Sequence, residues 1–97
     1  MRTKEIKDYI RAREHLFWYS PEDKTETVTD ELLVETILNY GNLNDVRELF
    51  NVFGKQNVAD IFFRVTTRSE RSKNNYNELT RNFFTLYFDK YAHRNII

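Results

Sequence analysis

The chain has 97 residues, of which 40% are hydrophobic and 15% aromatic, and its 15 basic side chains balance its 15 acidic ones. This length suits one domain spanning residues 1–97, and the apolar content is too high for a wholly disordered chain. The balanced charge excludes a global electrostatic field that would attract DNA or an anionic membrane. The absence of cysteine excludes disulfides, thiolate metal sites and a cysteine nucleophile.

No apolar run approaches the length of a membrane-spanning helix, and the start Met1-Arg2-Thr3-Lys4-Glu5 leads into a charged segment instead of a signal-peptide core. We therefore expect a cytoplasmic protein with no membrane partner. Charge is distributed unevenly: residues 22–54 are predominantly acidic, whereas residues 55–97 are predominantly basic. An intramolecular match between these two regions is favoured over a charged partner.

The first predicted helix covers residues 4 to 15, because Ile6, Tyr9 and Ile10 share one helical face behind Thr3 as a candidate N-cap. A compact apolar cluster follows at residues 16–19, and a polar connector leads to Val28.

Two helices joined near Gly41 form a predicted central helical hairpin. Thr29 can cap the first helix, and Gly41 stands where a left-handed C-terminal residue is common. Asn42 and Asp45 have the spacing of a capping box for the second helix, which Gly54 closes. The apolar faces of the two helices are predicted from helical spacing: Leu33, Val34, Ile37 and Leu38, then Val46, Leu49, Phe50 and Phe53.

The same spacing predicts a further helix around residues 58–65. Residues 66–75 contain no apolar side chain, so we expect an exposed, mobile loop there. The last helix is predicted from a set of apolar residues that covers more than one face: Leu79, Phe83, Phe84, Leu86, Tyr87, Phe88 and Tyr91. With no lasting alternation typical of strands, the fold class is all-α, a single small domain of about five helices.

No catalytic constellation is evident. Glu31 and Glu35 share a helix face but have no third ligand, and His15 and His93 have no partner motif. No glycine-rich loop carries a following Lys-Ser or Lys-Thr. We expect neither enzymatic activity nor a cofactor or metal.

Two binding hypotheses remain open. Four basic side chains could contact phosphates in DNA, although a solvated surface is the simpler interpretation: Arg64, Arg68, Arg71 and Lys73. The aromatic last helix is either central to the core or meets a protein partner, and these two alternatives are close to balanced.

Three blocks resemble a family of small bacterial proteins encoded beside abortive-infection nucleotidyltransferase toxins: Leu16-Phe17-Trp18, then residues 37–46, then residues 49–54. The similarity spans roughly residues 16 to 88, and the matching residues are of capping, glycine and core types. The resemblance implies an antitoxin that binds a cognate nucleotidyltransferase-like toxin and carries no catalytic residue.

On that basis the expected toxin-binding residues are the aromatic anchors Trp18, Phe84, Phe88 and Tyr91, with Glu31 and Glu35 as an acidic edge for a basic groove. The alternative is a DNA-binding regulator of its own operon, which would use the four basic residues. A homodimer is a further arrangement that the sequence leaves open.

Overall fold

The computed structural model describes residues 3–17 and 28–91. These ranges contain six α-helices, one 3₁₀ turn and no strand, which confirms the all-α class with about five helices. The elements in chain order are α1 (Lys4–Ala12), η1 (Glu14–Phe17), α3 (Asp30–Tyr40), α4 (Leu43–Phe53), α5 (Lys55–Arg68), α6 (Glu70–Lys73) and α7 (Glu78–Tyr91).

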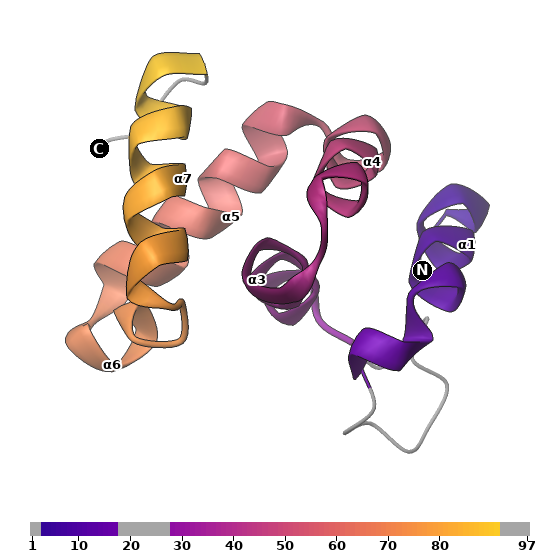
Figure 1. The fold of residues 1–97 in the computed structure, drawn as a ribbon, viewed down its shortest axis with the longest axis horizontal. Coiled ribbons are helices and arrows are strands. Elements are labelled where there is room, and N and C mark those ends of the chain that lie inside the picture. The colour runs from indigo at the N-terminus through magenta and orange to yellow at the C-terminus, as the bar shows by residue number, and fades with distance from the viewer. Residues whose placement is uncertain (1–2, 18–27, 92–97) are drawn as a thin grey trace.

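Helix α5 is the centre of the arrangement. It packs against α3, α4, α6 and α7, while α1 packs against α4. Helices α7 and α1 lie at opposite ends of the longest dimension, which measures 33 Å (Figure 1). One side of α7 therefore faces away from the other helices.

The predicted helix starts are confirmed by side-chain caps. The Thr29 hydroxyl accepts a hydrogen bond from the backbone N–H of Leu32 at 3.1 Å, and Thr3 caps α1 in the same way. The capping box of α4 is complete, because Asn42 Oδ1 accepts from the N–H of Asp45 at 2.8 Å and Asp45 Oδ2 accepts from the N–H of Asn42 at 3.0 Å. Each cap satisfies backbone donors that the first turn leaves free.

Gly41 does end α3, as predicted, but its predicted left-handed conformation is wrong. Its φ of −74° and ψ of 159° are extended and not left-handed. A Cβ at this position would lie 2.7 Å from the Ile37 carbonyl oxygen, so close backbone approach favours glycine. Gly54 has the positive φ, at 88°, and this single residue joins α4 to α5.

Two predicted element boundaries also need correction. The first helix ends at Ala12, and residues 14–17 form the 3₁₀ turn. The predicted loop at residues 66–75 is wrong, because α5 continues to Arg68 and α6 fills Glu70–Lys73. Ser69 supplies the cap for α6 by accepting from the N–H of Ser72 at 3.1 Å. Satisfied backbone groups hold these helical turns without an apolar anchor, and most of their side chains are exposed as expected.

An aromatic cluster around Phe62 joins α5 to α7. The Phe62 ring is fully buried, and its centroid lies 4.9 Å from that of Tyr76 and 5.5 Å from that of Phe88. Phe84 lies against the same ring at 6.4 Å. These contacts fix which face of α7 is turned to the core.

Asp45 connects α1 to α4. Its Oδ1 accepts from Nε of Arg13 at 2.8 Å, and the two side chains are only 16% and 14% exposed. The Tyr9 hydroxyl donates to the Asp45 carbonyl oxygen at 2.6 Å, and the Arg13 guanidinium lies 4.0 Å from the Tyr9 ring centroid. Burial raises the pKa of Tyr9, which keeps its hydroxyl a donor.

Replacing Asp45 by alanine should lower the free energy of unfolding by about 2–4 kcal/mol, because it removes half of the capping box and leaves the half-buried Arg13 without its carboxylate. Asp8→Ala is the matched control, since its pair with Arg11 is 55% exposed on both sides and should cost less than about 0.5 kcal/mol. Urea unfolding of both variants measures the difference; equal losses would contradict the role given to Asp45.

Replacing Phe88 by alanine should cost about 3–5 kcal/mol, since the ring is fully buried. Leu86→Ala, on the same helix but 72% exposed, should change the unfolding free energy by less than about 0.5 kcal/mol. Thermal and urea unfolding test the orientation of α7 directly, and a larger loss for Leu86 than for Phe88 would show that the helix is rotated.

Candidate functional site

The predicted aromatic anchors do not share one surface. Phe84 and Phe88 are 7% and 0% exposed, so the expectation that they contact a partner is wrong: the face of α7 that carries them covers α5. Tyr91 is 55% exposed and keeps its place as a candidate contact. Trp18 lies outside the described residues.

Another face of α7 is exposed and apolar instead. Leu79, Phe83 and Leu86 are 82%, 59% and 72% exposed, and their spacing of four and three residues places them on one side of the helix. We call these three residues the outer face of α7. Figure 1 shows α7 at the edge of the molecule, with no helix covering it from outside.

Aromatic rings pack along the edge of this face. The half-buried Tyr87 ring stacks on Phe83 at 6.1 Å and on Phe50 of α4 at 6.0 Å. The Tyr91 ring lies 4.9 Å from that of Tyr87, and Nζ of Lys55 lies 5.7 Å from the Tyr91 ring centroid. The outer face with Tyr91 is therefore an apolar surface with an aromatic border.

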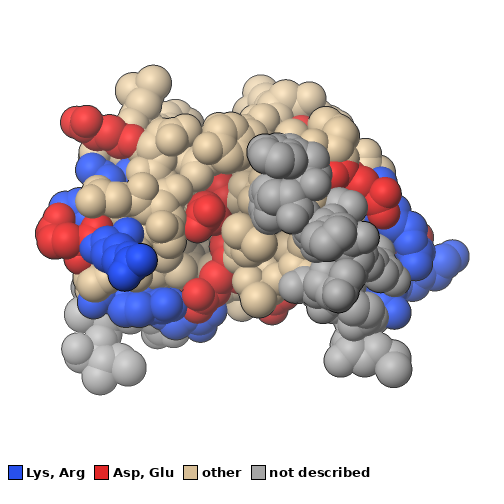
Figure 2. Space-filling view, turned by 90° about the horizontal axis from the view of Figure 1, so that it is seen from below, with Lys and Arg blue, Asp and Glu red and all other residues tan. Residues whose placement is uncertain are grey.

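The predicted acidic and basic surfaces meet each other. Glu31 Oε2 accepts from Arg68 at 2.8 Å and lies 3.4 Å from Nε of Arg64. These two pairs join the acidic region 22–54 to the basic region 55–97, as predicted. Acidic and basic side chains are correspondingly intermixed on the face shown in Figure 2.

Glu35 is a half-buried carboxylate on α3. Burial raises its pKa. The Tyr76 hydroxyl is buried and has no hydrogen-bond partner among the described residues; burial raises the pKa of Tyr76, and the charges of Glu35 and Glu31 raise it further. Glu35 is thus a partly desolvated carboxylate that interacts electrostatically with the buried Tyr76. It is a poor candidate for the exposed toxin contact that the sequence predicted.

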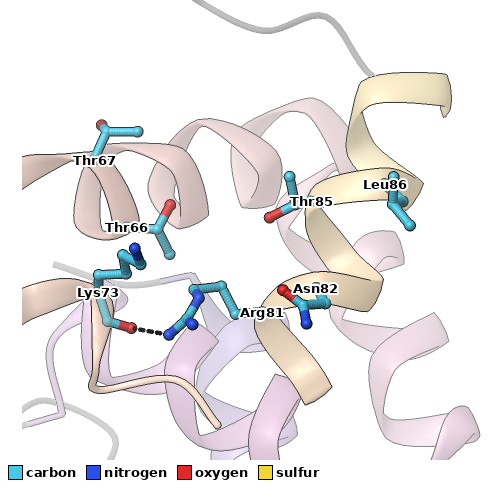
Figure 3. A pocket seen from close by; sticks show the side chains of 7 residues that line it. All are labelled: Thr66, Thr67, Lys73, Arg81, Asn82, Thr85 and Leu86. Carbon is cyan, nitrogen blue, oxygen red and sulfur yellow. Dashed lines mark hydrogen bonds between the residues drawn. The ribbon is translucent and has the colours of Figure 1, made fainter. Parts of the chain in front are cut away.

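The remaining predicted cations, Arg71 and Lys73, lie on α6. Arg71 is exposed, and Nζ of Lys73 lies 3.6 Å from the largely exposed Glu70. Lys73 also borders a cavity of about 520 Å³ between α5, α6 and α7 (Figure 3). The lining residues are Thr66, Thr67, Lys73, Arg81, Asn82, Thr85 and Leu86. Sequence reasoning missed this cavity, because its residues are far apart along the chain and form no motif.

The described ranges contain no group of three or more His, Asp or Glu side chains close enough to hold a metal ion. Within the same ranges, no helix has the length and apolarity to cross a membrane.

Comparisons with protein-family models, with curated proteins and with solved structures find no match to this chain.

Glu35→Gln should stabilise the protein at neutral pH, because the neutral amide avoids the desolvation of a half-buried charge. A carboxyl whose pKa is raised on folding stabilises the native state below its unfolded pKa and loses that contribution as the pH rises through the folded pKa. The stability gap between variant and wild type should accordingly shrink on acidification from pH 7 to pH 4. Urea midpoints measured across this range test it; a gap that widens would be inconsistent with the raised pKa.

Proposed function

We propose that this protein is a binding module that acts by contact, and that the outer face of α7, together with Tyr91, is its protein-binding surface. The observation that carries this proposal is the exposure of Leu79, Phe83 and Leu86 on one side of an edge helix. Exposing three large apolar side chains together costs solubility, and such patches typically mark interaction sites. A helix that presents apolar anchors at this spacing fits a hydrophobic groove on a partner.

The proposed partner is a nucleotidyltransferase-like toxin, as the resemblance implies. In that family pattern the matching blocks are of capping and core types, and here their described parts lie in η1, in α3–α4 and at the junction with α5. These blocks would hold α5, and α5 in turn holds α7 through Phe62. The proposed antitoxin would then inactivate its toxin by covering part of the toxin surface with α7.

The acidic edge plays a smaller part in this proposal than the sequence predicted. Glu31 is already paired with Arg64 and Arg68, so any contact with a basic groove would first have to break these pairs. Ion pairs weaken the alternative of a DNA-binding regulator, since Arg64 and Arg68 are partly neutralised by Glu31 and Lys73 is paired with the largely exposed Glu70. Arg71 is the cation from which a phosphate contact could start.

The test is a toxin-neutralisation assay combined with copurification from the native host. Phe83→Asp and Leu86→Asp should each weaken binding about 30-fold or more, because a charge would be buried in an apolar interface. Leu43→Asp is the matched control, since Leu43 is 75% exposed at the start of α4, away from α7. Wild type and the control should recover a nucleotidyltransferase in equimolar amount and rescue growth, whereas the two α7 variants should fail to do so while remaining folded.

Three results would contradict the proposal. Retention of the toxin by the α7 variants would place the interface elsewhere. Copurification of specific DNA with steeply salt-dependent affinity would favour the regulator. A concentration-dependent dimer that Phe83→Asp dissociates would assign the outer face to a second copy of the chain.

A further inference from the structure

The pocket between α5, α6 and α7 shares Leu86 with the outer face of α7, but the rest of its lining is polar or charged. Its lining contains two cationic side chains and no carboxylate, although the chain as a whole carries no net charge. Figure 3 shows Lys73 and Arg81 at one end of the cavity, with Thr66 on α5 and Thr85 on α7 on facing walls.

Unused hydrogen-bond donors converge on this space. One N–H of Arg81 donates to the carbonyl oxygen of Lys73 at 3.3 Å, and the structure gives its other N–H groups no partner among the described residues. The Thr85 hydroxyl and the Asn82 amide likewise have no partner within the described part of the chain. The ammonium of Lys73 lies 3.6 Å from Glu70, whose side chain is 85% exposed, so this ion pair is well screened by water.

The hydroxyl of Thr66 differs, because it already donates to the Phe62 carbonyl at 3.0 Å. Its oxygen can only accept a further hydrogen bond. The cationic end therefore offers N–H donors and positive charge, which a negatively charged ligand rich in acceptor oxygens would complement.

We propose that this cavity binds a small phosphorylated molecule, with the phosphate held by Arg81 and Lys73. The planar guanidinium offers paired N–H donors that match a phosphate, and the ammonium adds a flexible point charge. A phosphomonoester carries about 1.5 to 2 negative charges at pH 7, which matches the two cations.

The size of the cavity defines the rest of the ligand. Its volume of about 520 Å³ lies in the range of small-molecule sites and far exceeds the space that one phosphate needs. Asn82, Thr85 and the apolar side chain of Leu86 would contact the neutral body of the ligand, so we assign a sugar phosphate or a mononucleotide to the site. This assignment does not depend on the proposed toxin, because the cavity is complete within one chain.

The experiment is calorimetric titration of the isolated protein with adenosine 5′-monophosphate, ribose 5-phosphate and adenosine. The two phosphorylated probes should bind with Kd below about 1 mM, while adenosine should not bind measurably. Lys73→Gln and Arg81→Gln should each weaken phosphate-dependent binding by about tenfold or more. Arg47→Gln on α4 is the matched control, since it removes one positive charge outside the cavity and should leave the affinity unchanged.

A second variant keeps the test independent of folding. Because Arg81 also donates to the Lys73 carbonyl oxygen, circular dichroism must show that Arg81→Gln is folded. The second variant is Thr85→Val, which removes a hydroxyl from the pocket at nearly constant side-chain volume. Thr85→Val should weaken binding about threefold or more without changing the melting temperature.

Ribose 5-phosphate binding as tightly as the nucleotide would identify the sugar phosphate as the recognised unit, and tighter nucleotide binding would extend it to the base. Adenosine binding as tightly as its monophosphate, an equal loss in Arg47→Gln, or no binding of either phosphorylated probe would overturn the assignment. Phe83→Asp should bind the probes normally, so a failure here is distinguishable from a failure of the toxin-binding proposal.

Discussion

The burial of Phe62 on α5 is the constraint on which the rest of the structure depends. Its ring is fully buried against Tyr76, Phe84 and Phe88, so one side chain of the central helix contacts both α7 and the segment before it. Large rings contribute much of the apolar area that a chain of this size can bury. The orientation of α7 follows from this cluster, and both the outer face and the cavity follow from the orientation of α7.

Several charged side chains form ion pairs within the molecule. Asp45 both caps α4 and binds Arg13 of α1, and Glu31 binds Arg64 and Arg68 across the α3–α5 contact. These pairs reduce the surface field that a nucleic-acid-binding protein needs. The cations that line the pocket are less tightly paired, because the lining offers Arg81 no carboxylate and Lys73 lies 3.6 Å from Glu70, which is 85% exposed. That contrast separates structural charges from charges available to a ligand.

Scaffold and candidate function occupy different parts of the chain. Residues 37–46 and 49–54 form caps, turns and core in the first half of the described structure, whereas the exposed apolar face and the pocket belong to α5, α6 and α7. The chemistry of the binding surfaces has to be read from the last third of the chain, where Leu79, Phe83 and Leu86 are exposed on one side of α7.

The sequence by itself determined what is local. The caps at Thr29 and Asn42, the all-α class and the helix after Gly54 were predicted correctly, because a cap and an apolar stripe depend on residues three or four positions apart. The short helix α6 was not predicted, because it has no apolar stripe. It is stabilised instead by the Ser69 cap and by its satisfied backbone groups. Only the tertiary structure decided which face of α7 is buried. That helix is apolar on several sides, and two sets of residues have the same spacing of four and three. The set Leu79, Phe83 and Leu86 faces outward because Phe62 packs against Phe84 and Phe88 of the other set. Burial depends on contacts between elements that are distant in sequence, and so does the open pocket that α5, α6 and α7 line together.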